Sequence, residues 1–419
     1  MLLTPQQAVT ESQRCLYCFD APCTQACPVH IDIPKFISMI KSGNVIGAAK
    51  VVKSSHALAN VCGKVCPEEI FCQSVCNRAK QDTPIHIREL HFFATQHEAK
   101  NGFASLREFP KNGKKAAVIG AGPSGLGCAF ELSKLGYDVH VYDAKGLGGV
   151  PKNSIPAFRL SEEELGSDVD LLARHFHFHE TSVDSEAFAR IRQQHEATFI
   201  GVGLGLDKRL GITGEDLKGV YPVLEFLERA KENGSRSNFG SRVVIVGGGN
   251  VSLDAAATAK HLGAKEVTLV YRRSEMEMKV WKSELLEAKK LGVQMQFLAQ
   301  PMQILGEERV RGIRCRRTRL SEKVDSTGRP VPVEVPNSDF VLDADAVVVA
   351  IGQQIHAEFV HFFERTKQGF IKVDEAFQTS LPGIFAGGDA IAGEGTIVQA
   401  VAQGKQAAHS MHEYLKDRN

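Results

Sequence analysis

The stretch "KAAVIGAGPSGLGCAFELSKLGYDVHVYDA", residues 115–144, decides the fold of the middle of the chain. An apolar run leads into Gly120, Gly122 and Gly125, and a helix pattern and a second strand pattern ending at Asp143 follow. Such glycines let the backbone approach a pyrophosphate, the helix offers it free N–H groups, and the acid about twenty residues on accepts a bond from a ribose hydroxyl. The stretch predicts a Rossmann-like dinucleotide site.

The same strand–glycine–helix–strand pattern recurs in "RVVIVGGGNVSLDAAATAKHLGAKEVTLVYRR", residues 242–273. Its candidate nucleotide-binding residues are Gly247, Gly249, Asn250, Arg272 and Arg273. Its second strand ends in two arginines instead of an acid, and arginine forms charge-assisted bonds with a 2′-phosphate, which favours NADP over NAD. The alternative is that both arginines lie solvated on a loop. Two such sites suggest FAD in the first and NADP(H) in the second, with hydride passing between them.

Eight of the ten cysteines lie in two groups near the N-terminus, "RCLYCFDAPCTQACP" at residues 14–28 and "VCGKVCPEEIFCQSVC" at residues 61–76. The first group reads C-x2-C-x4-C-x3-C-P, like the ferredoxin run in which three close cysteines hold one iron–sulfur cluster and the cysteine before proline ligates another. Structural zinc instead takes paired C-x2-C knuckles. The spacing therefore predicts two [4Fe–4S] clusters, with Cys27 crossing from the first group to the second cluster.

Composition limits where the protein acts and what it binds. The formal net charge of +1 gives no long-range attraction toward nucleic acid or an acidic membrane. No apolar run is long enough to span a bilayer, and the N-terminus lacks the apolar core of a signal peptide. We expect a cytoplasmic protein, whose thiols are kept reduced, so metal ligation explains the cysteines better than disulfides do.

The pattern along the chain predicts an α/β fold with two Rossmann-like dinucleotide-binding domains, preceded by an α-helical iron–sulfur domain. An apolar stripe at helical spacing supports the helical domain, and its members are Ile33, Phe36, Ile37 and Ile40. Residues 100–115 are polar and basic and indicate a linker. We expect the iron–sulfur domain at 1–112, an FAD domain split into 113–202 and 350–419, and an NADP domain inserted at 203–349.

With both motifs and the cysteine groups in view, the chain resembles the small subunit of glutamate synthase and the N-terminal half of dihydropyrimidine dehydrogenase over nearly its whole length. "CLYCFDAPCTQACP", "GKVCPEEIFCQSVC" and "GGVPKNSIPAFRL" resemble most the dihydropyrimidine dehydrogenase branch, including its bacterial two-subunit form. The resemblance implies that Asp389, after Gly388, contacts the flavin ribityl chain. It also implies that Gly149 lies near the FAD and that Arg159 lies between flavin and cluster.

The resemblance also implies a ligand set for each cluster. One cluster takes Cys15, Cys18, Cys23 and Cys76. The other takes Cys27, Cys66, Cys72 and a fourth ligand that the family places downstream, where this chain has His91 in "IHIRELHFF". Counting cysteines alone would nominate Cys62 for that position. We favour His91, because imidazole is a known cluster ligand that raises the potential.

The expected function follows from this cofactor set. NADPH gives two electrons as hydride whereas iron–sulfur clusters accept one at a time, and flavin converts between the two. The chain ends soon after the second FAD motif, which leaves no room for an FMN barrel. We therefore expect an NADPH-oxidising electron-input subunit that serves an FMN- or iron–sulfur-containing catalytic partner in a dihydropyrimidine-dehydrogenase-like complex. The alternatives are a glutamate synthase small subunit and a stand-alone or bifurcating NADPH:ferredoxin-type oxidoreductase.

Two further cysteines bear on the choice of family branch. Cys128 and Cys315 belong to no C-x4-C pair. A disulfide reductase needs two neighbouring redox cysteines, so this spacing argues against the disulfide-reductase branch of two-dinucleotide flavoproteins.

Overall fold

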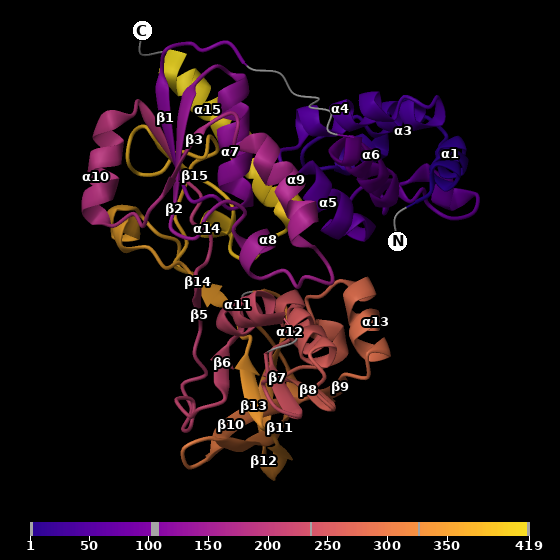
Figure 1. Cartoon of the computed structure of the whole chain (residues 1–419). Coiled ribbons are helices and arrows are strands. Elements are labelled where there is room, and N and C mark those ends of the chain that lie inside the picture. Colours follow the sequence, from indigo (N-terminus) through magenta and orange to yellow (C-terminus); the bar gives the residue numbers. More distant parts are fainter. Residues whose placement is uncertain (1–2, 102–108, 235–236, 326, 417–419) are drawn as a thin grey trace. The chain divides into compact units, whose positions relative to one another are not determined.

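The chain forms two compact units. The computed structural model describes residues 3–101, 109–234, 237–325 and 327–416. The first unit comprises Met1–Lys152, Ala157–Gly205 and Ile355–Asn419, and the second comprises Asn153–Pro156 and Leu206–Gln354. Colours in Figure 1 follow the sequence through both. Residues 102–108, within the predicted linker, lie outside the described residues.

The N-terminal part of the first unit is helical. Its α-helices are α1 (Pro5–Gln13), α2 (Pro22–Ala26), α3 (Ile33–Lys41), α4 (Val45–Ser55), α5 (Ala59–Val65) and α6 (Ile87–Asn101), and its 3-10 helices are η1 (Glu68–Ile70) and η2 (Asn77–Lys80). The side chain of Asp32 accepts a hydrogen bond from Lys35 N at the start of α3, and Pro34 suits the first helical turn.

The buried face of α3 consists of the predicted apolar stripe, Ile33, Phe36, Ile37 and Ile40. Each such side chain contributes roughly 1.5–3 kcal/mol when it leaves water. The predicted stripe is therefore confirmed as core.

The rest of the first unit is built on a parallel sheet in the order β15-β4-β1-β2-β3. Its strands are β1 (Lys115–Ile119), β2 (Asp138–Asp143), β3 (His177–Glu180), β4 (Ala197–Ile200) and β15 (Ile384–Ala386). Its helices are α7 (Pro123–Lys134), α8 (Val150–Asn153), α9 (Glu162–Leu172), α10 (Ser185–Gln194), η5 (Glu358–Phe362), α14 (Asp389–Ala392) and α15 (Ile397–Lys416).

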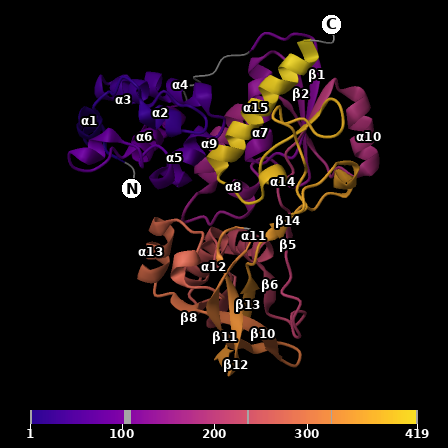
Figure 2. The same cartoon turned by 180° about the vertical axis from the view of Figure 1, so that it is seen from behind.

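Helices α7 and α15 pack along each other in both views (Figures 1 and 2). Their backbones approach closely, because a Cβ on Gly404 would lie 1.9 Å from the Ser124 carbonyl oxygen and one on Gly127 would lie 2.7 Å from the Val401 oxygen. Only glycine permits this approach. It brings the C-terminal helix against the helix that follows the first glycine motif.

The second unit contains another parallel sheet, in the order β6-β13-β7-β8-β9. Its strands are β6 (Val220–Pro222), β7 (Arg242–Val246), β8 (Glu266–Tyr271), β9 (Gln294–Phe297) and β13 (Ala346–Val349). Its helices are α11 (Val223–Asn233), α12 (Asn250–His261), η4 (Glu275–Glu277) and α13 (Lys282–Lys290). Between β9 and β13 in the chain lies an antiparallel sheet of β10 (Ala299–Gly306), β11 (Val310–Val324) and β12 (Pro330–Asp343). A separate pair of strands joins β5 (Leu206–Asp207) to β14 (Gln353–Gln354).

The predicted fold class is confirmed: two parallel sheets, each containing a strand–glycine loop–helix–strand motif, follow a helical N-terminal part. The first sheet takes β15 from beyond the second unit, so the second unit is inserted in the chain between β4 and β15. The compact second unit runs from Leu206 to Gln354, whereas the predicted insertion is 203–349.

Candidate cofactor sites

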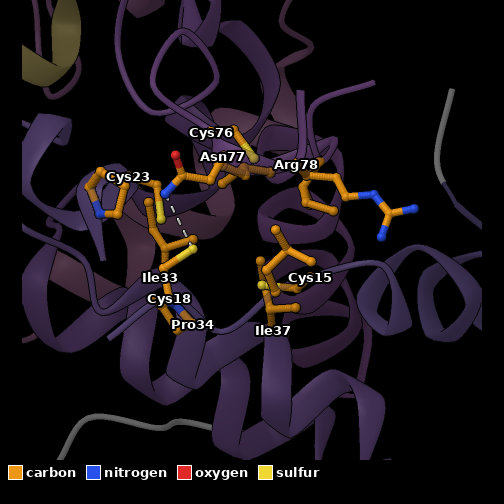
Figure 3. Close-up of a pocket in the computed structure, with 13 residues that line it drawn as sticks. Cys15, Cys18, Cys23, Ile33, Pro34, Ile37, Cys76, Asn77 and Arg78 are labelled. Carbon is orange, nitrogen blue, oxygen red and sulfur yellow. Dashed lines mark hydrogen bonds between the residues drawn. The ribbon is translucent and has the colours of Figure 1, made fainter. Parts of the chain in front are cut away.

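Four cysteines from separate segments line one pocket of the first unit. Cys15 and Cys18 follow α1, Cys23 lies in α2 and Cys76 precedes η2. Figure 3 shows these four cysteines around one pocket. We call these residues the first cysteine site. The structure thus brings together the four ligands that the sequence assigns to one cluster.

The walls and charges of the first cysteine site suit a buried polynuclear metal centre. Apolar side chains such as Ile37 and Ile85 line the pocket. Burial, together with the neighbouring thiols of Cys15 and Cys76, raises the pKa of the Cys23 thiol to about 11. Thiols that raise one another's pKa lie close together, and a bound metal centre relieves their repulsion by favouring the thiolates.

The backbone of the first cysteine group is strained at two residues. Tyr17 and Ala21 have positive φ angles of 51° and 40°, a region that non-glycine residues rarely adopt and that is enriched at functional sites. The Asn77 side chain donates from Nδ2 to Cys18 Sγ at 3.5 Å. Hydrogen bonds to ligand sulfur tune cluster potentials, and this residue was missed from the sequence although it directly follows Cys76.

A second group of cysteines lies deeper. We call Cys27, Cys62, Cys66 and Cys72 the second cysteine site. Burial raises the pKa of Cys66 to about 12 and that of Cys72 further, and the thiols of Cys27 and Cys66 add to the rise at Cys72. Burial also raises the pKa of Cys27, while backbone N–H groups of residues 29–31 donate to its sulfur and oppose that rise.

His91, the predicted fourth ligand beside these cysteines, lies buried on α6. Its Nε2 has no hydrogen-bond partner among the described residues, while a hydrogen bond joins the ring to the backbone of Ala59. Burial lowers the pKa of His91 to about 4, so the imidazole is neutral. A neutral ring bonded at one nitrogen with a free lone pair at the other is the form in which histidine ligates metals.

Cys62 is the competing donor for the same position. Burial raises the pKa of its thiol well above the usual value, and Cys66 and Asp168 raise it further. The thiols of Cys66 and Cys27 both act on Cys62, so Cys62 lies close to them. The choice of His91 over Cys62 stays a prediction.

The first glycine motif forms the turn expected for a dinucleotide. Gly120 has a φ of +100°, and a Cβ on Gly125 would lie 1.8 Å from the Gly120 oxygen. Gly122 lies directly before α7, and the nearest protein atom to a Cβ placed there would be Gly149 Cα at 4.0 Å. The protein alone therefore has room for a side chain at position 122. A pyrophosphate bound at the start of α7 would need that space, which explains the glycine.

Asp143 and the C-terminal segment lie at the same edge. Asp143 Oδ2 accepts from Ala121 N at 2.8 Å and its Oδ1 accepts from Lys145 N at 2.7 Å, which fixes the carboxylate and leaves lone pairs for a ribose. Ser124 Oγ would lie 2.5 Å from a Cβ on Gly388, so the loop before α14 reaches the first turn of α7.

Two further predicted residues have different surroundings. Burial and the neighbouring Glu394 raise the pKa of Asp389 to about 6. Arg159 lies half-buried ahead of α9. Gln403, whose Oε1 accepts from Gly388 N at 2.7 Å, was missed from the sequence, since no motif marks it.

The second glycine motif, in the second unit, has the same construction. A Cβ on Gly247 would lie 2.2 Å from the Ala350 oxygen, and Gly249 directly precedes α12. Asn250 Oδ1 accepts from Trp281 N at 2.9 Å and so fixes the segment before α13. The start of α12 therefore offers a second pyrophosphate position.

The two arginines after β8 differ, which corrects the prediction that both hold a phosphate. Arg273 is 2% exposed; its guanidinium donates to the Pro330 carbonyl at 2.9 Å and to Asp325 at 2.6 Å. It therefore anchors the β11–β12 connection. Arg272 is exposed at the surface, but partial burial of its guanidinium, together with the cations Arg273 and Arg329, lowers its pKa. Only Arg272 is left to meet a 2′-phosphate.

The remaining cysteines are structural. All ten cysteines are free, and Cys128 and Cys315 are buried. Cys128 Sγ lies 3.8 Å from Met411 Sδ, in the contact between α7 and α15.

Within residues 3–101, 109–234, 237–325 and 327–416, no helix has the length and apolar composition needed to cross a bilayer.

Known proteins match the chain over both parts. A family described as "Dihydroprymidine dehydrogenase domain II, 4Fe-4S cluster" matches residues 1–103, and one described as "Pyridine nucleotide-disulphide oxidoreductase" matches residues 114–404. The small chain of glutamate synthase [NADPH] from Halomonas elongata is 34% identical over 98% of this chain and 91% of its own. The NAD-dependent dihydropyrimidine dehydrogenase subunit PreT of Escherichia coli is 33% identical over 98% and 94%.

Other matches extend beyond this chain or concern the fold alone. The NADP(+)-dependent formate dehydrogenase subunit beta of Moorella thermoacetica is 36% identical over 94% of this chain, which spans 60% of that protein's length. Among solved structures, Mycobacterium tuberculosis FprA in complex with NADPH aligns with a TM-score of 0.63 at 19% identity, over 73% of this chain and 85% of that one. Thioredoxin reductase of T. acidophilum aligns at 0.57 and 22%, over 73% and 100%. These two likenesses support the fold of residues beyond the helical part.

Proposed function

The chain belongs to the pyridine nucleotide-disulphide oxidoreductase family and also matches a dihydropyrimidine-dehydrogenase-type 4Fe-4S domain at its N-terminus, and we propose that it is an NADPH-oxidising electron-input subunit. It is an NAD(P)H-dependent flavin- and iron–sulfur-containing oxidoreductase. In the proposed reaction NADPH yields NADP⁺, a proton and two electrons, which leave singly through two [4Fe–4S] clusters. FAD supplies the conversion from a two-electron to a one-electron carrier when bound.

One observation carries the proposed route. Helix α15 begins beyond the Asp389 loop and brings Lys405 against the helical part, where Lys405 Nζ donates to Ser55 O at 3.5 Å. Burial raises the pKa of Cys27, and the same ammonium opposes that rise. The second cysteine site therefore borders the part of the protein that would hold FAD, which supports electron entry there.

Side chains at the dinucleotide motifs would bind and orient the cofactors. The N-terminal N–H groups of α7 would hold the FAD pyrophosphate, Asp143 a ribose and Asp389 the ribityl chain. The N-terminus of α12 would hold the NADPH pyrophosphate and Arg272 the 2′-phosphate. Cys15, Cys18, Cys23 and Cys76 would supply the ligands of one cluster, and Cys27, Cys66, Cys72 and His91 those of the other.

The partner we propose is a catalytic subunit of a dihydropyrimidine-dehydrogenase-like complex, containing FMN or iron–sulfur clusters. The PreT matches, named as dihydropyrimidine dehydrogenase subunits, support this choice. The alternative is a glutamate-synthase-type partner, which the Halomonas match supports. Anaerobic purification of tagged protein from its own cells, with mass spectrometry of bound chains, discriminates them. Recovery without any FMN-binding or iron–sulfur subunit would contradict the partner proposal.

Nucleotide preference tests the electron donor, because the relatives carry both NAD and NADPH in their names. A charge-assisted contact is worth roughly 1.5–3 kcal/mol, about one to two decades of affinity. Arg272→Ala should therefore raise KM for NADPH by roughly ten- to a hundredfold and leave KM for NADH nearly unchanged. The readout is steady-state reduction of an artificial acceptor.

Arg329→Ala serves as the control, since it removes a neighbouring cation that the proposal does not place on the phosphate. Two results would overturn the assignment of NADPH. One is a wild-type preference for NADH, and the other is a ratio of KM for NADPH to KM for NADH that Arg272→Ala leaves unchanged.

A further inference from the structure

A cluster of imidazoles lies on the β2–β3 side of the first sheet, outside the sites described above. Register pairs His140 of β2 with His177 of the edge strand β3, and His179 follows two residues later on the same face. His195, at the end of α10, contacts His140 with ring centroids 5.1 Å apart. Asp138, at the start of β2, completes the cluster.

Three of these residues aim ligand atoms at one point. His177 Nε2 lies 3.2 Å from Asp138 Oδ1, and His140 Nε2 lies 3.5 Å from Asp138 Oδ2. One donor atom from each of the three lies within 4.8 Å of the others. A tetrahedral ion with bonds of about 2.0–2.2 Å holds its ligand atoms roughly 3.4 Å apart, which matches the two short separations.

A second layer of contacts prepares His140 as a ligand. Its Nδ1 is hydrogen-bonded to His179 Nε2 at 3.0 Å, and the two rings stack with an interplanar angle of 9°. Its Nε2 is buried and makes no hydrogen bond within the described residues. When Nδ1 carries the proton, Nε2 presents its lone pair toward Asp138, as in the histidine pairs that support metal ligands.

A hydrogen bond also orients the ring of His195. Its Nδ1 lies 2.8 Å from the Ile191 carbonyl oxygen, and its ring packs edge-on against that of His140.

The point of convergence is open to solvent. The His177 side chain is 62% exposed and that of Asp138 is 30% exposed, so an ion can enter and retain a water ligand. Lys111 Nζ lies 3.9 Å from Asp138 Oδ1. A bound metal ion and the Lys111 ammonium would therefore both contact the Asp138 carboxylate.

We propose that Asp138, His140 and His177 bind one divalent transition-metal ion of the zinc class, with His179 as the positioning residue of His140. Two imidazoles and one carboxylate suit Zn²⁺, whereas Mg²⁺ and Ca²⁺ prefer oxygen ligands alone. Because the ligands come from β2 and the edge strand β3, the bound ion ties that edge to the sheet. The site is independent of the FAD, NADPH and cluster positions.

The test uses the full-length holoprotein with FAD and clusters in place, dialysed anaerobically against chelator-buffered Zn²⁺. Wild type should bind one additional Zn²⁺ per chain saturably. His177→Ala and Asp138→Asn should weaken this binding roughly a hundredfold or more, and His179→Ala roughly ten- to a hundredfold. The exposed His361 offers a matched control, and His361→Ala should bind as wild type does.

Zinc X-ray absorption separates this site from zinc held by cysteine. The proposal requires a shell of nitrogen and oxygen at about 2.0–2.2 Å, whereas thiolate would add sulfur at about 2.3 Å. FAD content reports whether each variant folds, and the exposed His177 is the position least apt to disturb folding. Equal Zn²⁺ affinity in wild type and folded His177→Ala, absence of saturable binding, or a sulfur shell would overturn the proposal.

Discussion

The two cysteine sites of the first unit have similar ligands in different surroundings. At the first site Cys15, Cys18, Cys23 and Cys76 are all partly exposed, whereas at the second Cys27, Cys62 and Cys72 are buried. The first site has the side-chain amide of Asn77 beside it, and the second has the ammonium of Lys405. An exposed centre can meet a partner protein, while a buried one bordered by α15 can receive electrons from within. This difference suggests that electrons enter at the second site and leave at the first.

The largest expected effect separates the two sites by iron content. Anaerobically prepared wild type should hold about eight irons per chain, as two [4Fe–4S] clusters require. Cys76→Ser and Cys66→Ser should each lower this to about four, because each removes a ligand of a different cluster. Iron and sulfide analysis provides the measurement.

Cys315→Ser is the matched control, since Cys315 is buried in the second unit and should leave both clusters intact. Loss of all iron in either variant would show that the two sites depend on each other, which contradicts the description of two separate cluster sites. Zinc in place of iron would contradict the assignment of iron–sulfur clusters.

A smaller effect tests the eighth ligand. His91→Ala should change the electron paramagnetic resonance spectrum of one reduced cluster and leave the other unchanged, because it removes a ligand of the second site only. Cys62→Ser should leave both spectra unchanged. The reverse pattern would assign the position to Cys62.

The smallest effect concerns the charge beside the second site. Lys405→Met removes a cation near Cys27 and should lower the potential of the second-site cluster alone. The loss of one nearby cation in a protein interior should lower the potential by on the order of tens of millivolts. Spectroscopic redox titration measures the shift.

Lys134→Met is the control for this shift. Lys134 Nζ also donates to the end of α4, at the Ser54 oxygen 3.1 Å away, but Lys134 has no role in the pKa of Cys27. A fall in the first-site potential, or an equal fall with Lys134→Met, would show that the two sites do not differ in the way described.

Local spacing made much of the fold predictable. The positive φ of Gly120 and the contact of Gly125 with the Gly120 oxygen are local, and the apolar stripe of α3 follows from a single helical period. Such features depend on neighbours in sequence, so residue type and spacing are sufficient. The confirmed fold class rests on them.

Long-range pairings were out of reach for the same reason. Arg273 bonds to Asp325, 52 residues further on, and nothing near "VYRR" marks that partner. The histidine cluster depends on the register that places His140 opposite His177, and a shift of one residue would turn the side chains to the other face. The antiparallel sheet of β10–β12 was likewise not predicted.

The claim that electrons leave through the first site is tested most directly in Cys76→Ser. Anaerobic stopped-flow measurement would follow flavin reduction by NADPH and reduction of cytochrome c, a protein-sized one-electron acceptor, in the same sample. We predict that flavin reduction keeps its wild-type rate while cytochrome c reduction falls to near background. Cytochrome c reduction at the wild-type rate, in protein that has lost the first-site cluster, would contradict the account.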